Sequence, residues 1–275
     1  IQDMSMDIKN TVDQVKRMIT ENGSPGELEY FNYHEKRYLR MANSMVKNVQ
    51  FGGYVLDIGS HFLHSSMILS LLGFKVVGMD VSEFWSMQFV KERAETFKIE
   101  SVIQDDLQLL SANDFGHNRF DGILFTEILE HITFNPINFW HQIYHLLKDK
   151  GKIYISTPNA LSSTGILRAL KNLFTFRGLG ISIEMIFSQV TYGHHWKEYS
   201  ARELKSYFSQ LSNGFHVNLK RYGYQKFDNR NFTYWFWSTI RLIGDLTYVF
   251  CSDLEAVITV DKSPANIWKL KAPNY

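Results

Sequence analysis

The sequence predicts an α/β fold, a doubly wound, seven-stranded and mostly parallel sheet with an N-terminal helical extension. Short runs rich in Val and Ile alternate along the chain with stretches of helical period. This β-α-β-α order is typical of parallel strands with helices on both faces of the sheet. Right-handed crossovers then place a ligand site at the carboxyl ends of the strands.

Each element is predicted from its own pattern, in chain order. A helical stretch at 27–49 lies within an N-terminal helical cap, 1–50, and one domain follows at 51–275 with insertions after the fifth and sixth strands, at about 160–199 and 225–253. The strands are expected at 54–58, 75–80, 101–104, 120–125, 152–156, 215–221 and 255–260. Helices are expected at 65–72, 84–97, 136–147 and 161–174, and from a capping box at Ser200-Ala-Arg-Glu203 to about 211.

The composition excludes several classes of protein. The 275 residues contain 29 Lys or Arg and 28 Asp or Glu, a balance that argues against binding of nucleic acid. Hydrophobic residues make up 45% of the chain, which excludes a disordered protein. The single cysteine, Cys251, excludes an internal disulfide framework. Ile1 to Asn10 lack a signal-peptide pattern and no run is long enough to span a membrane, so we expect a cytoplasmic protein.

Polar residues follow the predicted strands where each strand ends. The first strand leads into a turn with Gly59, where the backbone can approach a ligand closely and the next helix offers free N–H groups. The second strand ends in Asp80, and a carboxylate there can accept two hydrogen bonds from a ribose diol. The third ends in Asp105-Asp106-Leu107, where one carboxylate could accept from an exocyclic amine of a base. These positions predict a nucleotide-type site.

In this order the motifs resemble those of class I S-adenosylmethionine-dependent methyltransferases, in the small-molecule branch with ubiquinone-type and sugar-modifying members. The matching stretches are Leu56-Asp-Ile-Gly59, Gly78-Met-Asp80, Gln104-Asp-Asp-Leu107, Thr126-Glu-Ile-Leu-Glu130-His131, Gly151-Lys-Ile-Tyr-Ile-Ser and His195-Trp-Lys-Glu198-Tyr199. The resemblance covers about residues 30–222 and the last strand. It implies a Rossmann-like methyltransferase fold and S-adenosyl-L-methionine as cofactor.

The resemblance also implies which residues hold the cofactor. Asp80 would hold the ribose hydroxyls, Asp106 would face the adenine amine, and Arg37 could pair with the cofactor carboxylate. Asp57 permits two interpretations, a cofactor contact or a structural acceptor for turn amides. The implied cofactor-binding set is Arg37, Asp57, Gly59, Ser60, Asp80, Val81, Asp106, Leu107, Thr126 and Glu127.

One position departs from the family pattern. The family usually shows Gly-x-Gly in the first turn, and His61 stands here at the second Gly. A side chain there narrows the space beside the cofactor and restricts the backbone angles. One interpretation is a turn that holds His61 outward and binds the cofactor normally. The alternative is a non-catalytic binding or scaffolding protein. A nucleotide-dependent dehydrogenase is a third hypothesis, and the lack of Gly-x-Gly-x-x-Gly argues against it.

Candidate catalytic residues lie in two loops. An oxygen nucleophile benefits from a general base that titrates near pH 7, which favours histidine. The candidates are His131, His194 and His195, with Glu198 as orienting group and Tyr199 as hydrogen-bond donor. A packing role is an equally open interpretation of His131, and exposed loop residues without a catalytic role are the alternative for His194 and His195. The adjacent pair His194-His195 makes a poor zinc site, so no metal is expected.

Charge and aromatic residues are distributed unevenly. Residues 160–230 contain ten Lys or Arg and four Asp or Glu, a net of +6 in a chain whose total is +1. This favours a small-molecule or lipid-linked anionic substrate, such as a nucleotide- or lipid-phosphate-linked sugar of surface-polysaccharide biosynthesis. The aromatic segment 231–250 permits three interpretations: a helix packed on the sheet, a cover over the substrate or subunit contact, or a helix at the inner membrane face. The oligomeric state is not predicted.

Overall fold

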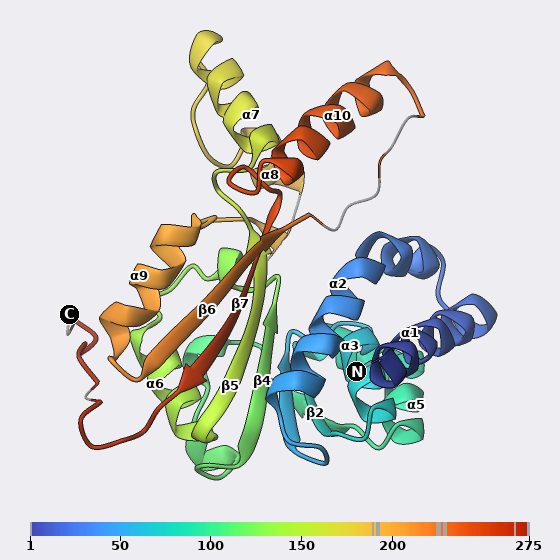
Figure 1. The fold of residues 1–275 in the computed structure, drawn as a ribbon, viewed down its shortest axis with the longest axis vertical. Helices are drawn as coiled ribbons and strands as arrows, with labels where there is room; N and C mark the ends of the chain where they lie inside the picture. Colours follow the sequence, from blue (N-terminus) through green and yellow to red (C-terminus); the bar gives the residue numbers. More distant parts are fainter. Residues whose placement is uncertain are drawn as a thin grey trace.

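A seven-stranded sheet forms the centre of the protein (Figure 1). The structure is a computed structural model that describes residues 2–188, 190, 193–223, 227, 230–266 and 268–273. The strands are β1 (Tyr54–Ile58), β2 (Lys75–Asp80), β3 (Glu100–Ile103), β4 (Phe120–Thr126), β5 (Leu147–Pro158), β6 (Phe215–Tyr222) and β7 (Asp253–Val260). Their order is β3-β2-β1-β4-β5-β7-β6, and β7 runs antiparallel to both neighbours while the other pairs are parallel. The predicted doubly wound, mostly parallel sheet is confirmed.

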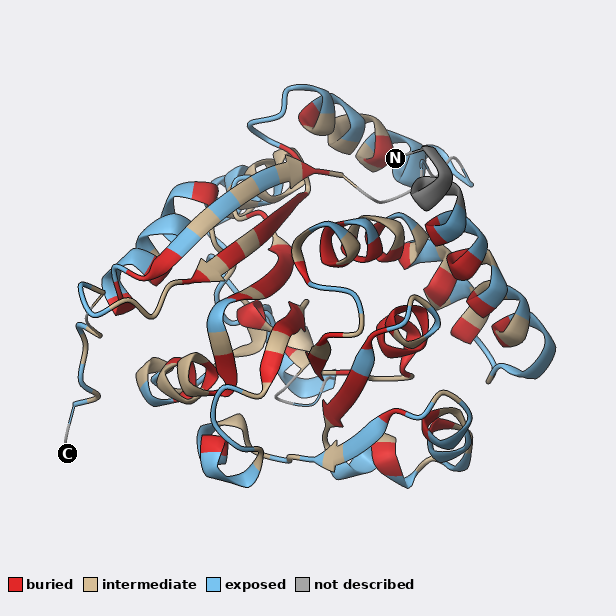
Figure 2. Cartoon of the chain, turned by 60° about the horizontal axis from the view of Figure 1, so that its bottom comes forward, coloured by how far each residue is buried: buried red, intermediate tan, exposed pale blue. Residues whose placement is uncertain are grey.

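Helices cover both faces of the sheet. One face packs against α1 (Gln2–Asn22), α2 (Glu27–Asn48), α3 (His64–Leu71) and α5 (Gln88–Thr96). The other face packs against α6 (Ile137–Leu146) and α9 (Ala201–Leu211). Buried residues concentrate on the strands and on the helix sides that face them (Figure 2). This apolar framework fixes the carboxyl ends of β1, β2, β3 and β4, where the polar motifs lie.

The N-terminal cap joins the same core as the sheet. In α1, Ile8, Val12, Val15 and Ile19 are all buried, because their spacing places them on one side of a helix. They belong to one apolar cluster with residues of α2, α3 and the strands. The cap therefore brings α2 beside the turn that follows β1.

One helix differs from the prediction. The sequence predicts a single helix at 84–97, whereas the structure has α4 (Ser82–Ser86) and α5 (Gln88–Thr96). Met87 separates them because its backbone is extended, with φ −71° and ψ 125°. No proline or glycine marks this break, so helical periodicity alone did not reveal it. The first of the two helices, α4, begins at Ser82, two residues after Asp80.

The two insertions build a unit that extends away from the sheet. The first contains α7 (Ser163–Phe174) and α8 (Ile183–Ser188), and the second contains α10 (Phe232–Leu246). We call α7 and α10 the projecting helices; they lie side by side beyond the strand ends (Figure 1). No residue of α7 is buried, and only Ser238 and Gly244 of α10 are. The interpretation of α10 as a helix packed on the sheet is therefore wrong. Two charges of the basic segment, Lys226 and Asp228, lie outside the described residues.

Candidate active site

The turn after β1 is shaped by positive φ angles and fastened by Asp80. Gly59 has φ 74°, a conformation that favours glycine, and a Cβ there would overlap Cδ1 of Ile128. The Asp80 carboxylate accepts the backbone N–H of His61 at 2.6 Å and that of Val81 at 2.7 Å. Burial raises the pKa of Asp80. One carboxylate thus ties the end of β2 to the turn after β1.

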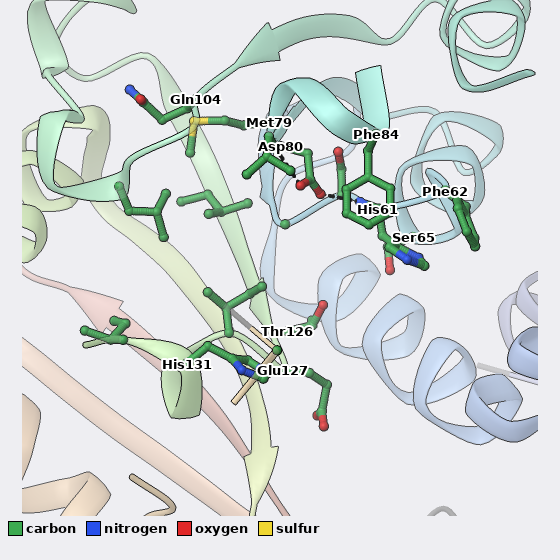
Figure 3. Close-up of a pocket in the computed structure, with 18 of the residues that line it drawn as sticks. His61, Phe62, Ser65, Met79, Asp80, Phe84, Gln104, Thr126, Glu127 and His131 are labelled. Atoms are coloured by element: carbon green, nitrogen blue, oxygen red, sulfur yellow. Dashed lines mark hydrogen bonds between the residues drawn. The ribbon is translucent and has the colours of Figure 1, made fainter. Parts of the chain in front are cut away.

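A cavity of about 610 Å³ opens against this turn. Asp80 and His61 lie on one side of it, and Thr126, Glu127 and His131 lie on the other (Figure 3). The His61 ring does not point outward, as one of the two interpretations of this turn required: it packs against Phe62 and Phe84, with its ring centroid 3.8 and 4.4 Å from theirs. Burial lowers the pKa of His61 to about 4, so the ring is neutral near pH 7. His61 is therefore part of an aromatic wall and leaves the cavity open.

The loop after β3 presents two carboxylates at the far edge of this first cavity. Asp105 accepts the backbone N–H of Ser82 at 2.7 Å. Asp106 accepts that of Gln108 at 2.9 Å and so caps a short 3₁₀ helix, η1 (Leu107–Leu109). Asp105, Asp106 and Leu107 all line the cavity. Asp105 thus holds the start of α4, Asp106 holds its own loop, and the structure brings both carboxylates to the edge where the sequence predicts base recognition.

All but one of the predicted cofactor residues line the first cavity. They are Arg37, Gly59, Ser60, Asp80, Val81, Asp106, Leu107, Thr126 and Glu127. Asp57 is the exception and lies behind the wall, where it accepts a hydrogen bond from Ser66 Oγ at 2.6 Å. Burial, together with the charge of Asp80, raises the pKa of Asp57 to about 7. The structure thus favours the structural interpretation of Asp57.

Arg37 and Glu127 stand between the first cavity and a second one. The guanidinium of Arg37, on α2, lies 3.6 Å from Glu127 Oε1, and Ser156 Oγ donates to the same oxygen at 2.7 Å. Tyr30, Arg37, Glu127 and His131 line both cavities. The two cavities therefore meet at a junction of charged and aromatic side chains.

The second cavity, of about 580 Å³, lies between the sheet and the projecting helices. Arg168 of α7 and Arg241 of α10 line it, together with Trp237. His131 belongs to the 3₁₀ helix η3 (Leu129–His131), and His195 comes from the loop ahead of α9. Its remaining lining includes Glu130 and Glu198, so both signs of charge face this space.

Three of the five predicted catalytic residues reach the second cavity: His131, His195 and Glu198. His131 Nδ1 lies 3.0 Å from the carbonyl oxygen of His194, and His195 Nδ1 lies 3.1 Å from Glu198 Oε1. Burial, reinforced by His195, lowers the pKa of His131 to about 4. The two rings meet edge to face, with centroids 4.9 Å apart.

The other two predicted catalytic residues face elsewhere. His194 is buried, and its Nε2 lies 3.0 Å from the carbonyl oxygen of Met185 at α8. Tyr199 packs its ring against Tyr207 of α9 and lines neither cavity. His194 is bonded toward α8 and His195 toward Glu198, and of the two only His195 lines the cavity. The prediction of a catalytic role for His194 and Tyr199 finds no geometric support.

Several cavity residues were missed by sequence reasoning. The aromatic wall of the first cavity includes Tyr30 and Phe84, which come from α2 and α4. A signal existed for Phe84, because it follows the Asp80 strand end by one helical turn. Trp237 and Arg241 carried no such signal, since only the placement of α10 brings them to the second cavity.

The first cavity fits the cofactor that the resemblance implies. Its volume lies in the range of small-molecule sites, and it combines apolar walls with a few fixed polar groups. Ser60 Oγ is buried on its wall and has no hydrogen-bond partner among the described residues, as expected for a group that a ligand would satisfy. Asp80 would hold the ribose, Asp106 the base, and Arg37 the carboxylate.

Comparisons with known proteins agree with this geometry. A chain in the complex of the Haloferax volcanii Trm112 methyltransferase activator and a putative methyltransferase is 15% identical, with a TM-score of 0.57 over 83% of this chain and 92% of that one. A SAM-dependent methyltransferase from Archaeoglobus fulgidus is 19% identical, with a TM-score of 0.52 over 84% and 99%. Haemonchus contortus phosphoethanolamine N-methyltransferase 2, solved with S-adenosyl-L-methionine, is 13% identical, with a TM-score of 0.52 over 90% and 60%. No curated protein sequence matches.

A family model decides the assignment. The model described as a methyltransferase domain matches residues 14–217. This range spans β1 to β5, the predicted cofactor-binding residues and the two loops with the candidate catalytic residues. The order of the strands, the hydrogen bond between Asp80 and the turn after β1, and the open first cavity are consistent with this family. The chain therefore belongs to the methyltransferase domain family and is a class I S-adenosylmethionine-dependent methyltransferase.

Proposed function

We propose that the enzyme methylates a hydroxyl or amine of a lipid-linked anionic molecule, such as a phosphate-linked sugar of surface-polysaccharide biosynthesis. The observation that supports this most is the pair of adjoining cavities, which share Tyr30, Arg37, Glu127 and His131. The first cavity has the features of the cofactor site. The second lies where an acceptor could approach the methionine end of that site, beside Thr126 and Glu127.

The residues at the junction suit methyl transfer. S-Adenosylmethionine supplies an activated methyl group when bound, so the protein mainly aligns the acceptor and removes its proton. The Nδ1 atoms of His131 and His195 face oxygen acceptors, which assigns their protons there and leaves the Nε2 lone pairs available. Both rings line the second cavity. An acceptor hydroxyl or amine placed against them can donate its hydrogen bond to either nitrogen.

The side of the second cavity formed by the projecting helices suits an anionic group. Arg168 and Arg241 line it from α7 and α10. A guanidinium pairs well with phosphate because its planar donors match the phosphate oxygens. None of the four acidic residues that line the cavity in the described part of the chain is on these helices: Glu127 follows β4, Glu130 is in η3, Glu198 is in the loop ahead of α9, and Asp253 begins β7. We infer that the phosphate of the substrate binds beneath the projecting helices and the acceptor group lies near the histidines.

The apolar surface of the insertions suits a lipid. Large hydrophobic side chains are exposed along this unit: Leu170, Leu173, Phe174, Phe176, Leu179, Ile183, Ile186, Phe187, Phe232, Trp235, Leu242, Ile243 and Leu246. Lys171 and Arg177 lie among them in the sequence and can meet anionic headgroups. No helix in the described part of the chain is long and apolar enough to cross a membrane. We infer a peripheral position at the cytoplasmic face of a membrane, with the projecting helices in the interface.

Vesicle co-sedimentation tests this part of the proposal. We expect the protein to pellet with phosphatidylglycerol-containing vesicles and less with pure phosphatidylcholine. The double variant Phe176→Ser and Phe187→Ser should weaken binding at least about tenfold, because each Phe is exposed and its burial in lipid contributes roughly 1.5–3 kcal/mol. Phe51→Ser is the matched control, since Phe51 is also exposed but lies ahead of β1. Equal binding by all three proteins would contradict the proposed surface.

A further inference from the structure

Three potential metal-binding side chains converge at the wall of the second cavity. Glu130, His131 and His195 each offer one ligand atom, and these atoms lie within 4.8 Å of one another. The residues come from η3 and from a loop more than sixty positions later, so no sequence spacing reveals the group. Backbone contacts hold the two segments together, because the N–H groups of Trp196 and Lys197 donate to the Glu130 carbonyl oxygen at 2.8 and 3.3 Å.

The Glu130 carboxylate provides a second, independent observation. Its side chain is fully buried, at 0% exposure. Thr157 Oγ1 donates to Oε2 at 2.9 Å, whereas Oε1 is buried without a hydrogen-bond partner and lies 3.9 Å from His131 Nε2. A buried carboxylate oxygen without a hydrogen-bond partner is costly, and a cation is a common solution. The unpaired oxygen therefore lies near the His131 imidazole, in the group that also includes His195.

The outer partners of both histidines are those of metal ligands. A ligating imidazole almost always donates its other N–H to a carbonyl or carboxylate oxygen, which fixes the tautomer and the ring. His131 Nδ1 has the carbonyl oxygen of His194, and His195 Nδ1 has Glu198 Oε1. These bonds leave Nε2 of each ring as the atom with a free lone pair.

We propose that Glu130, His131 and His195 bind one divalent transition-metal ion at the wall of the second cavity. Two imidazoles and one carboxylate suit Zn²⁺, Co²⁺, Ni²⁺ or Fe²⁺ and leave coordination positions open for an exogenous oxygen. The side chains of His131 and His195 are 20% and 40% exposed toward solvent, so a ligand can reach the ion. Provided the proposed function holds, that ligand is the acceptor hydroxyl, whose pKa the ion would lower. The histidines then act as ligands and not as bases.

Metal titration of the untagged full chain tests this inference without cofactor or substrate. The protein is stripped with a chelator, dialysed, and titrated with Zn²⁺ by calorimetry and with Co²⁺ by visible absorption. We expect one ion per chain, and a loss of affinity of at least about tenfold in His195→Ala and in Glu130→Gln. His195 is partly exposed, so its variant should fold even if the buried Glu130→Gln variant does not.

His141→Ala is the matched control. His141 and His145 of α6 form a second histidine pair, with Nε2 atoms 3.2 Å apart, that could bind a metal by itself. We expect His141→Ala to retain the stoichiometric site. Absence of stoichiometric binding, or binding lost in His141→Ala and kept in His195→Ala, would overturn the inference. Because S-adenosylhomocysteine binding is measured separately, failure of the metal site leaves the proposed function standing, and failure of the cofactor site leaves the metal result standing.

Discussion

Asp80→Ala should reduce the affinity for S-adenosylmethionine and S-adenosylhomocysteine at least about 100-fold in calorimetric titration. The Asp80 carboxylate holds the backbone N–H groups of His61 and Val81 and also lines the first cavity. A hydrogen bond to a charged group contributes roughly 1.5–3 kcal/mol, and each 1.4 kcal/mol corresponds to about tenfold in affinity. Removal of the carboxylate therefore removes both the hydrogen bonds that hold the turn after β1 and the proposed acceptor for the ribose hydroxyls.

Asp105→Ala is the matched control for this prediction. Asp105 lines the same cavity, but its carboxylate is exposed and is held by Ser82, including the backbone N–H of that residue. We expect the Asp105→Ala variant to bind both compounds within about threefold of the affinity of the unaltered protein, since the hydrogen bonds of such an exposed carboxylate contribute little net free energy. Two results would contradict the proposed cofactor site. One is an equal loss of cofactor affinity in both variants, and the other is normal cofactor binding by an Asp80→Ala variant whose fold is intact by circular dichroism.

Glu27→Gln should destabilise the protein by about 3–5 kcal/mol, as expected when one partner of a buried ion pair is removed. Glu27 opens α2 and is almost fully buried. Arg93 donates to both of its oxygens, at 2.6 and 3.2 Å, and His64 Nε2 lies 2.7 Å from Oε1. Urea unfolding of the variant and of the unaltered protein measures the difference in unfolding free energy. Since His64 begins α3 directly after the cofactor turn, we also expect weaker cofactor binding.

The pH dependence of this effect has a definite sign. Burial alone would raise the pKa of Glu27, but hydrogen bonds from His64 and Arg93 lower it to about 2. A lowered pKa in the folded state adds stability that is present above the ordinary value of 4.5 and is lost as the pH falls toward 2. The stability difference between the unaltered protein and Glu27→Gln should therefore shrink between pH 5 and pH 3.

Glu29→Gln is the control for this second prediction, because Glu29 is exposed on the same helix. We expect its unfolding free energy to change by less than about 0.5 kcal/mol at every pH. A destabilisation equal to that of Glu27→Gln, or a Glu27→Gln effect that grows on acidification, would refute the role given to the buried pair.

The sheet could be predicted from sequence because its strands are local patterns. The strands β1, β2 and β4 are buried on both sides of the sheet. Such strands consist of nearly continuous apolar residues, so they can be recognised from the amino-acid sequence itself. The strand-end residues Gly59 and Asp80 follow from those runs, which explains why most predicted cofactor residues line one cavity. Short sequence motifs were therefore enough to predict those parts of the site that are formed by the ends of consecutive strands.

The projecting helices and the second cavity could not be predicted in this way. The apolar residues of α10 have a helical spacing that is compatible with packing on the sheet, and only the tertiary structure shows that they are exposed. The meeting of Glu130 with His195 depends on the path of a distant loop. Equally, nothing in the sequence distinguishes His194 from His195, because their different partners depend on that same path.

The central claim is that the first cavity binds the cofactor of a methyltransferase, and a calorimetric titration of the unaltered protein with S-adenosylhomocysteine tests it most directly. We predict one molecule bound per chain, and competition with S-adenosylmethionine for the same site. Absence of binding of both compounds by folded protein would contradict the claim.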